Sequence, residues 1–491
     1  MKLRELIYED EYLFSDADEG IEIDSLAVSA RGIDESTLLI IPNSKKPPSL
    51  SESERYPRAV IAETDFPVPD GIPTVRVENA RLAEALVYSR FYGVDYSKIS
   101  VIGVTGTNGK TSTASFIKHI LAECGRSVGF IGTGRIEYGE ELLSSKEYSM
   151  TTPDPPLLYP SLAKMIKSGI DTVVMEVSSH ALALRKVDAI PFDFAVFTNL
   201  SPEHGDFHPS LEEYYLTKKR LFSLAKRGAV SLDDPYGRRL ASEYPKRVTS
   251  VGAVYRADYY ASDIERVGLE GLCYIFHGKD FIFKTRLSVG GIYSVYNSAL
   301  AAAVCIEMGC APCEVKRAIS SLKKIDGRFE IIKGSPTVII DYAHTDAAYR
   351  TILSDVRKNC MGAHITAVFG CGGERDREKR PRMAEAVEKY ADKIIVTSDN
   401  SRGEPTVDII CDIIKGFKSL SFSVIADRRE AILEAIKEAP EDGIVLLLGK
   451  GAERYNIDEH GYHEFDERVV VKEALEKRKA EYEKNENKAR I

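Results

Sequence analysis

The chain has 491 residues, with 66 Lys and Arg against 75 Asp and Glu, which gives a formal net charge of −9. At roughly 100–200 residues per domain, this length predicts two to four domains. The 44% hydrophobic and 29% charged residues are ordinary shares for a globular protein, which excludes wholesale disorder and a fibre. The acidic balance argues against a nucleic-acid partner, because a nucleic-acid binder carries a basic patch.

Membrane and secretion signals are not found in the sequence. No apolar run approaches the ~20 residues that span a bilayer, and MKLRELIYEDEYLF carries acids where a signal peptide needs an apolar core. The eight cysteines are too scattered for a disulfide scaffold, and the one CxxC pair, Cys310 and Cys313, has no second ligand pair for zinc. We therefore expect a cytoplasmic protein with reduced thiols and no membrane insertion.

The order of apolar segments predicts an α/β fold with three domains. Residues 1–98 contain short strand-like runs such as LAVSA, STLLIIP and RAVIAE. From residue 99 strands alternate with helices, and 265–290 interrupts this order with an antiparallel pattern. A second alternating run fills 335–491, beginning with TVIIDY. Because strand–helix alternation implies parallel sheets with right-handed crossovers, we predict domains at 1–98, 99–334 and 335–491.

The strongest local motif is GTNGKT at residues 106–111, between a predicted strand and a predicted helix. Its glycines allow backbone N–H groups to face phosphate oxygens, and the helix N-terminus adds positive partial charge. Lys110 would reach the β- and γ-phosphates, and the Thr111 hydroxyl would bind Mg²⁺. The general motif asks for glycine at the position of Val104, but the strand–loop–helix order still predicts ATP or GTP binding.

The string VIGVTGTNGKTSTA resembles the nucleotide loop of the Mur ligase family, the ATP-dependent amide-forming enzymes of peptidoglycan precursor synthesis. The similarity covers the chain from near Ala80 onward and is weaker before it. Within the family, the motifs are most similar to members that add a diamino acid to UDP-N-acetylmuramoyl-L-alanyl-D-glutamate. The further matching strings are TTPDP (151–155), MEVSSHAL (175–182), FTNLSPEHGDFH (197–208), YNSALAA (296–302), GRFE (327–330), DYAHT (341–345) and FGCGGERDREKRPRM (369–383).

The resemblance implies a fold and a reaction. The fold would be a small N-terminal α/β domain that binds UDP, a central P-loop ATPase-like parallel sheet with an antiparallel addition, and a C-terminal Rossmann-like domain. In the reaction, ATP converts the dipeptide carboxylate into an acyl phosphate, which an amine attacks to form the amide. The implied cofactors are ATP and Mg²⁺ at two sites, the implied partners are the UDP-muramoyl-dipeptide and a free diamino acid, and the chain is expected to be a monomer.

Catalytic and ATP-binding residues follow from the resemblance. Glu176 ends the predicted strand DTVVMEV, where side chains reach the crevice of an α/β sheet, and the family makes it a Mg²⁺ ligand with Thr111 and His204. Lys218 reads from the sequence alone as a solvated helical lysine, whereas the family carbamylates the lysine here, with Lys219 as the alternative register. The implied catalytic residues are Lys110, Glu176, His204 and Lys218, and the implied ATP contacts are Gly106, Thr107, Asn108, Gly109, Lys110, Thr111, Ser112, Asn297, Arg328, Asp341 and His344.

Substrate contacts are implied in the same way. Residues 399–402 resemble the DNPR motif of meso-diaminopimelate enzymes, whose arginine can pair with a distal carboxylate that lysine and ornithine lack. Ser401 replaces the family's proline and Ala452 its histidine, so L-ornithine and L-lysine stay open as alternatives. The implied muramoyl-dipeptide contacts are Arg31, Thr151, Thr152, Ser178 and Lys186 (an arginine in the family), and the implied diamino-acid contacts are Arg375, Asp399, Asn400, Arg402, Gly449 and Glu453.

Two further hypotheses remain open. The chain could belong to the folylpolyglutamate-forming or D-Ala-D-Ala-adding type, although DNSRGE and GKGAE argue against both. It could instead be a non-catalytic nucleotide-binding relative, a reading supported by the departures at Lys186 and Ala452 and at Ala30, since the family's DSR uridine-site motif corresponds at best to Ser29, Ala30 and Arg31. The intact Lys110, Glu176, His204 and Lys218 argue against that reading, because a protein that only binds a nucleotide needs no second metal site.

Overall fold

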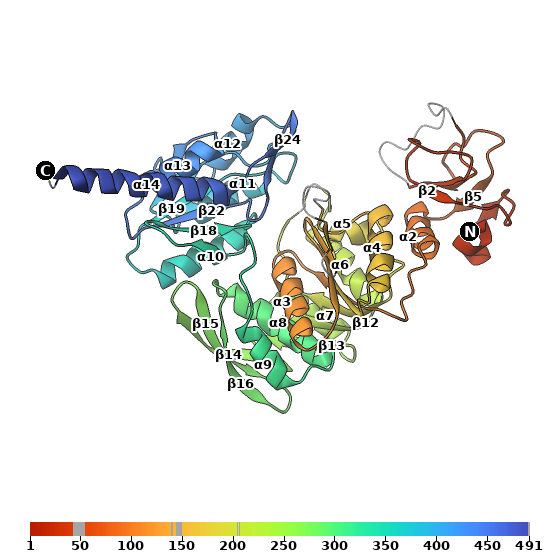
Figure 1. Ribbon diagram of the computed structural model, residues 1–491, viewed down its shortest axis with the longest axis horizontal. Coiled ribbons are helices and arrows are strands. Elements are labelled where there is room, and N and C mark those ends of the chain that lie inside the picture. Colours follow the sequence, from red (N-terminus) through yellow and green to blue (C-terminus); the bar gives the residue numbers. More distant parts are fainter. Residues whose placement is uncertain (43–54, 139–140, 144–149, 204, 206, 490–491) are drawn as a thin grey trace.

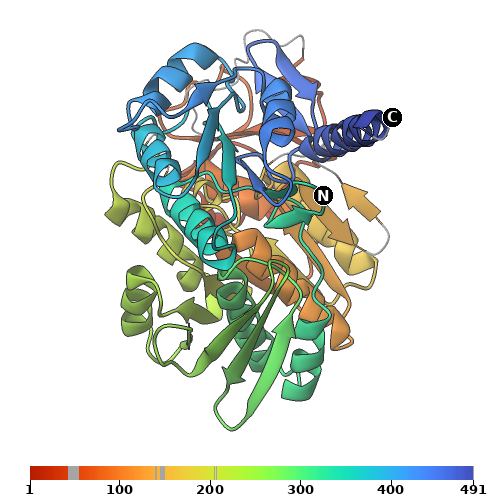
Figure 2. The ribbon, with the colours of Figure 1, turned by 90° about the vertical axis from the view of Figure 1, so that its left-hand side faces the viewer.

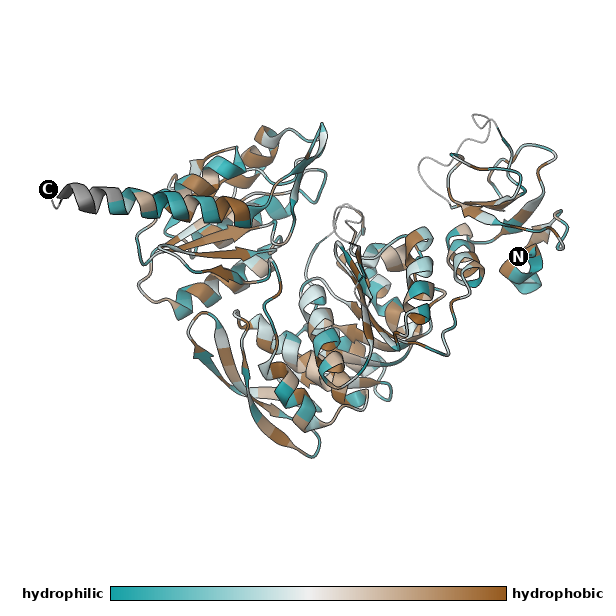
Figure 3. Cartoon of the chain, viewed as in Figure 1, coloured by the Kyte–Doolittle hydropathy of each residue, from teal (hydrophilic) through white to brown (hydrophobic). Residues whose placement is uncertain are grey.

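The computed structural model describes residues 1–42, 55–138, 141–143, 150–203, 205 and 207–489, with side chains up to residue 483. The predicted α/β class is confirmed, because three large sheets follow one another along the chain, most of their strands pair in parallel, and a fourth sheet has only the two strands β23 and β24. Figure 1 shows an N-terminal, a central and a C-terminal unit, and Figure 3 shows their strands as mainly hydrophobic. The domain limits at 98/99 and 334/335 stay a prediction.

The N-terminal unit contains α1 (Leu3–Leu6), η1 (Glu9–Glu11), β1 (Phe14–Ser15), β2 (Ser25–Ala27), β3 (Thr37–Ile41), β4 (Ala59–Glu63), β5 (Thr74–Val77) and α2 (Ala80–Phe91). Its sheet has the order β1-β5-β4-β3-β2, and only the β1–β5 pair is antiparallel among the described strands. The inner strands β3 and β4 are almost fully buried, as parallel strands covered on both faces should be.

The central unit contains β6 (Ser100–Thr105), α3 (Lys110–Glu123), β7 (Val128–Gly132), β8 (Arg135–Tyr138), β9 (Glu141–Leu143), α4 (Pro155–Lys167), β10 (Thr172–Glu176), α5 (Ser179–Ala183), β11 (Phe192–Phe197), α6 (Leu211–Ser223), β12 (Ala225–Ser231), α7 (Pro235–Glu243), β13 (Val248–Gly252), β14 (Tyr259–Val267), β15 (Gly271–His277), β16 (Ile282–Leu287), α8 (Tyr293–Glu307) and α9 (Pro312–Ser320). Its sheet has the order β16-β15-β14-β13-β12-β11-β6-β10-β7-β8-β9. The predicted antiparallel addition is confirmed as β14–β16 and begins earlier than expected, at Tyr259.

The central sheet buries apolar side chains on both faces, because neighbouring residues of a strand point in opposite directions. In β6, Val101 belongs to a cluster with α4 and α6, whereas Ile102 belongs to a cluster with α3 and α8. The first cluster continues into the N-terminal unit, where Val87 of α2 shares it with Leu158 of α4. The N-terminal and central units are therefore joined by a continuous apolar core.

The C-terminal unit contains β17 (Glu330–Ile332), β18 (Thr337–Asp341), α10 (Asp346–Asn359), β19 (Ile365–Phe369), α11 (Lys379–Glu388), β20 (Lys393–Val396), α12 (Thr406–Ile414), β21 (Ser423–Val424), α13 (Arg428–Glu438), β22 (Ile444–Leu448), β23 (Tyr455–Asp458), β24 (Gly461–Glu464) and α14 (Glu467–Ala489). Its six-stranded sheet has the order β17-β18-β22-β19-β20-β21 and is parallel except for β17. β17 precedes the predicted limit at 334/335 yet pairs with β18, so the C-terminal sheet starts before that limit.

The loops after β18, β19, β20 and β22 leave the same edge of the C-terminal sheet, where α/β proteins bind ligands. Figure 2 shows this unit lying against the central one, with α14 projecting away from both. Among the described residues, no helix is both long enough and apolar enough to cross a membrane.

A buried ion pair anchors α14 to the C-terminal unit. Arg428 of α13 and Glu467 of α14 are each 1% exposed in their side chains, and Arg428 Nε donates to Glu467 Oε1 at 2.8 Å. The same guanidinium donates to the carbonyls of Ser398 and Leu448, at 3.0 and 2.9 Å. This arginine therefore ties two helices to the loops that follow β20 and β22.

We expect Glu467→Ala to lower the free energy of unfolding of the C-terminal unit by about 3–5 kcal/mol, because Arg428 would keep a buried charge without its carboxylate. Glu473→Ala is the matched control, since Glu473 also pairs an arginine of α13 but is exposed. Glu473→Ala should lower the free energy of unfolding by less than about 1 kcal/mol. Urea unfolding of both variants measures the difference, and equal losses would contradict the expectation.

Candidate active site

The loop between β6 and α3 has the backbone that its glycines predict. Gly106 and Gly109 have φ of 147° and 83°, where residues with a Cβ are rarely found. A Cβ on Gly109 would lie 2.6 Å from Oδ1 of Asn297, the predicted adenine contact on α8. A Cβ on Gly106 would lie 1.9 Å from Oγ1 of Thr198. Both glycines are therefore needed for the close approach of neighbouring elements to the loop.

Two lysines contact the inner side of this loop. Lys110 Nζ donates to the carbonyls of Gly106 and Thr107, at 2.9 and 2.8 Å. Lys218 Nζ donates to the same Gly106 carbonyl at 2.9 Å. Burial lowers the pKa of Lys110, with a smaller contribution from Arg328. The loop thus gathers positive charge next to the backbone that would hold phosphates.

The interpretation of Lys218 as a solvated residue is wrong, because Lys218 is 1% exposed. On α6 it lies one turn after Tyr214 on the buried face, and its ammonium is 4.5 Å from the centre of the Tyr214 ring. Burial and the charge of Lys110 hold its pKa well below that of a free lysine. Lys219 pairs with Glu243 at 2.8 Å, so Lys218 is the lysine of α6 that contacts the loop.

The predicted Mg²⁺ ligands Thr111 and Glu176 lie together. Glu176 is 1% exposed at the end of β10 and accepts from Thr111 Oγ1 at 2.8 Å. It also accepts from the backbone N–H and the hydroxyl of Thr133, at 3.0 and 3.2 Å. Arg328 Nη2 donates to Thr111 Oγ1 at 3.1 Å. A carboxylate and a hydroxyl are the oxygen ligands that Mg²⁺ prefers, so this donor pair fits the predicted ion.

Other possible metal ligands are less informative. His204 lies outside the described residues. Cys310 is buried and Cys313 is exposed, so the CxxC pair does not share one environment. In the part of the chain that the structure describes, no group of three or more His, Cys, Asp or Glu side chains is placed to hold a metal ion.

Glu203 is a residue that sequence reasoning missed. Its Oε1 lies 2.6 Å from Nε2 of His344, which belongs to the loop after β18 in the C-terminal unit. Nδ1 of His344 lies 2.9 Å from the Tyr342 carbonyl. Asn108 of the nucleotide loop also reaches this segment, donating to Thr345 Oγ1 at 3.4 Å. These contacts place the β18 loop next to the nucleotide loop, and the signal for Glu203 was its position beside His204.

The predicted ATP contact Asp341 is engaged with protein donors. It accepts from the Tyr293 hydroxyl at 2.8 Å and from the backbone N–H groups of Phe329 and Ala343, both at 2.7 Å. Burial raises the pKa of Asp341, and Arg328 opposes this shift. Asp341 therefore fixes the junction between α8 and the C-terminal sheet, and its contact with ATP stays a prediction.

Three of the five predicted muramoyl-dipeptide residues, Thr151, Thr152 and Ser178, lie close to Glu176, and a fourth, Lys186, pairs with the segment that contains the two threonines. Thr152 Oγ1 donates to the Glu176 carbonyl at 2.9 Å and accepts from the Ser178 N–H at 3.0 Å. Thr151 Oγ1 accepts from the Thr133 hydroxyl, and Lys186 pairs with Asp154 of the TTPDP segment at 2.6 Å. The fifth residue, Arg31, is exposed in the turn after β2 of the N-terminal unit.

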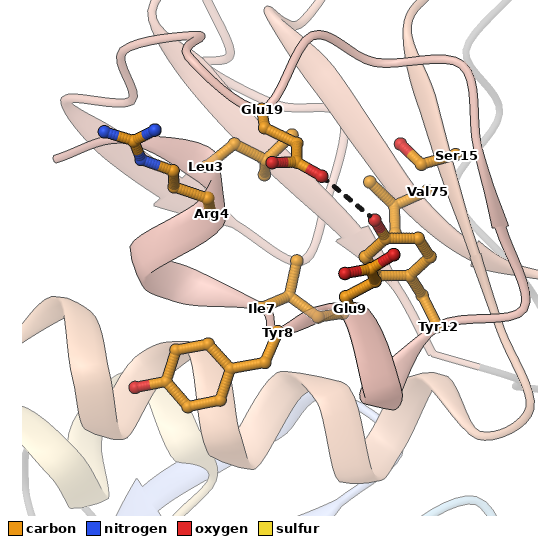
Figure 4. Close-up of a pocket in the computed structure, with 9 residues that line it drawn as sticks. All are labelled: Leu3, Arg4, Ile7, Tyr8, Glu9, Tyr12, Ser15, Glu19 and Val75. Carbon is orange, nitrogen blue, oxygen red and sulfur yellow. Dashed lines mark hydrogen bonds between the residues drawn. The ribbon is translucent and has the colours of Figure 1, made fainter.

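The N-terminal unit also holds a cavity of about 120 Å³. Figure 4 shows Tyr12 and Glu19 at this cavity, joined by a hydrogen bond of 3.3 Å. It lies beside α1 and β1, whereas Arg31 follows β2 at the other edge of the sheet. None of the predicted site residues lines it.

The predicted diamino-acid residues converge at the ends of β19, β20 and β22. Asn400 Nδ2 donates to Glu453 at 2.7 Å, and its Oδ1 accepts from Lys450 at 2.9 Å. Lys450, a second residue that sequence reasoning missed, is fully buried and lies 3.9 Å from Asp399 and 3.5 Å from Glu453. A Cβ on Gly449 would meet Oδ2 of Asp399 at 2.6 Å, which explains the glycine.

The two carboxylates of this cluster have pKa values shifted in opposite directions. Burial raises the pKa of Glu453, and nearby Asp399 adds to the shift. Lys450 and Arg428 hold the pKa of Asp399 below its usual range against the effect of burial. Asp399 and Glu453 thus share the buried Lys450, and Asp399 is stabilised by a second cation, Arg428.

Two predicted arginines meet above Gly372. A Cβ there would lie 3.0 Å from Nη1 of Arg402 and 3.7 Å from Cγ of Arg375. Arg402 Nη1 donates to the carbonyls of Gly373 and Asn400, at 3.0 and 3.1 Å. The Arg402 guanidinium is therefore close enough to Asp399 to lower the pKa of that carboxyl, so the cluster combines positive and negative groups, a pattern suited to an amino acid with both charges.

Comparisons with known proteins identify the family of both larger units. The Mur ligase middle domain matches residues 104–305, and the Mur ligase glutamate ligase domain matches residues 327–451. UDP-N-acetylmuramoyl-L-alanyl-D-glutamate--2,6-diaminopimelate ligase of Caldanaerobacter subterraneus subsp. tengcongensis is 40% identical over 422 residues, covering 85% of this chain and 86% of the relative. The ligase of the same name, numbered 1, from Clostridium acetobutylicum is 34% identical over 488 residues, covering 97% and 99%.

Solved structures are similar over the same length. A structure named as UDP-N-acetylmuramoyl-L-alanyl-D-glutamate--2,6-diaminopimelate ligase matches with a TM-score of 0.67 at 26% identity, covering 97% of this chain and 99% of that one. Folylpolyglutamate synthase of Mycobacterium tuberculosis shares the fold, with a TM-score of 0.62 at 17% identity and coverage of 75% and 92%. With both family domains matched and curated relatives aligned along most of its length, this chain belongs to the Mur ligase family.

Proposed function

We propose that this protein is an ATP-dependent amide ligase that adds meso-diaminopimelate to the D-Glu of UDP-N-acetylmuramoyl-L-alanyl-D-glutamate. The supporting relatives carry the name of this reaction at 34–40% identity. The observation that supports the choice of amino acid is that Arg402, Arg375 and Asn400 all approach Gly372, while Asn400 also donates to Glu453. Action as a monomer in the cytoplasm is part of the same proposal.

The central unit would perform the activation step. A carboxylate oxygen of the dipeptide attacks the γ-phosphorus of ATP, and ADP leaves. Lys110, which contacts the loop at the Gly106 carbonyl, would neutralise charge on the transferring group, where a positive side chain lowers the barrier. Thr111 and Glu176, with His204, would hold Mg²⁺, which supplies further positive charge to the phosphate oxygens.

The C-terminal unit would bind the incoming amine. Asp399 and Glu453 would accept from an ammonium group, while Arg375 and Arg402 would pair with the distal carboxylate of diaminopimelate. L-Lysine and L-ornithine offer the ammonium but lack that carboxylate, so they would leave the guanidinium groups without a partner. The amine attacks the acyl phosphate carbonyl, the amide bond forms, and phosphate leaves.

The test is phosphate release from ATP with the UDP-muramoyl-dipeptide and meso-diaminopimelate, L-lysine, L-ornithine or no amine, with mass spectrometry of the product. We expect turnover with diaminopimelate, and we expect Lys110→Ala to lower it by about 100-fold or more. Lys118→Ala is the control, because Lys118 is a half-buried lysine of the same helix that pairs with Glu137.

Each result of this assay decides between the hypotheses. Turnover with lysine or ornithine instead would contradict the assigned amino acid. ATP binding without turnover in any tube would show a non-catalytic relative.

The buried Lys218 is proposed to carry a carbamate. Burial and the charge of Lys110 hold the pKa of Lys218 well below that of a free lysine, which favours loss of its proton; the unprotonated nitrogen can attack CO₂, forming a carbamate and releasing one further proton. Protein equilibrated with ¹³C-bicarbonate should show a carbamate ¹³C signal that disappears in Lys218→Met and persists in Lys219→Met. A signal unchanged in Lys218→Met would refute the assignment.

A further inference from the structure

Two crevice loops of the C-terminal unit are joined by a buried ion pair that the proposed chemistry does not use. The pair is Arg380 of α11 and Glu404, the residue before Pro405 at the start of α12. Arg380 is fully buried and donates from both terminal nitrogens to Glu404, at 2.8 and 2.7 Å. We call this pair the loop clamp.

The loop clamp holds the backbone of the loop after β19. Oε2 of Glu404 accepts from the Glu374 N–H at 3.0 Å, and Arg380 Nη2 donates to the Gly372 carbonyl at 3.3 Å. The hydrogen bonds from Arg380 lower the pKa of Glu404 to about 2, so the carboxylate is ionised at any working pH. Both ends of the Gly372–Glu374 segment are therefore attached to one charge pair.

The same segment fixes the guanidinium of Arg402. The Gly373 N–H donates to the Asn400 carbonyl at 2.9 Å, and the Gly373 and Asn400 carbonyls both accept from Arg402 Nη1. A Cβ on Gly373 would lie 1.9 Å from the Ser401 carbonyl, so the two loops touch through backbone atoms. Any shift of Gly373 would move the acceptors that orient Arg402.

The loop clamp also supports a residue whose backbone is strained. Glu374 and Arg402 have φ of 54° and 53°, a left-handed conformation that residues with a Cβ adopt at a cost. One such residue lies in each of the two loops. Strained residues persist only where their surroundings hold them. Here the Glu374 N–H donates to Glu404, and Arg402 donates to backbone carbonyls, and these hydrogen bonds supply that support.

We infer that Arg380 and Glu404 are positioning residues that set the carboxylate-binding geometry of Arg402, and thereby the preference for an amino acid with a distal carboxylate. The inference rests on the proposed function, because it concerns the residues that would read diaminopimelate. Arg380 and Glu404 do not contact the substrate in this proposal. Its effect should therefore appear in the binding of one substrate and not in the phosphoryl transfer step.

The test is steady-state kinetics of Glu404→Gln, which keeps the side-chain shape but removes its charge. We expect KM for meso-diaminopimelate to rise by about tenfold, while KM for ATP and for the UDP-muramoyl-dipeptide stays within about twofold. Turnover with L-lysine should not fall, since lysine has no distal carboxylate. The preference for diaminopimelate over lysine should therefore drop by about the same tenfold factor. Glu404→Asp, which retains the charge, should restore part of this preference.

Arg429→Gln is the matched control, because it breaks an exposed Arg–Glu pair of the same unit. If Glu404→Gln does not fold, Arg380→Lys tests the same contact with the buried charge retained. An unchanged diaminopimelate KM, or an equal loss for all substrates including lysine, would overturn the inference. Absence of turnover with every amine in the unsubstituted protein would instead refute the proposed function.

Discussion

The carbonyl oxygen of Gly106 accepts hydrogen bonds from the Nζ atoms of two buried lysines, Lys110 and Lys218. Keeping two ammonium groups together away from water is unfavourable, so the pKa of each lysine is lowered. Glu176 and Glu203 supply negative charge in the protein, and both raise the pKa of Lys110 against the effect of burial. A nucleotide triphosphate supplies much more, so the charge of Lys110 that burial disfavours in the free protein is the feature that favours an anionic ligand.

In the C-terminal crevice the buried groups that need a partner of opposite charge are carboxylates rather than lysines. There Asp399 and Glu453 share Lys450, and Arg402 and Arg375 both approach Gly372. The crevice thus has an acidic part and a basic part rather than one dominant charge. An amino acid with separated ammonium and carboxylate groups matches both parts, which a simple amine would not.

The parts of the site predicted from sequence are those defined by local pattern. The GTNGKT loop and the strand ending at Glu176 are contiguous motifs, and the structure brings Thr111 and Glu176 together as expected. The parts that were missed depend on partners far apart in the chain: Arg380 and Glu404 are separated by 24 positions, and Glu203 and His344 by 141. Lys218 was misread because its burial depends on how α6 packs, which the composition of one helix does not disclose.

The units are joined by two kinds of contact. The N-terminal and central units share an apolar cluster through α2 and α4. The central and C-terminal units meet through hydrogen bonds, such as that between Glu203 and His344, and through Leu269 and Tyr293, which pack against the C-terminal core. Heat capacity and denaturant sensitivity both scale with the surface that a transition exposes. Opening this contact would therefore change both quantities only by the side chains it uncovers, and distance probes placed across it would follow the movement directly.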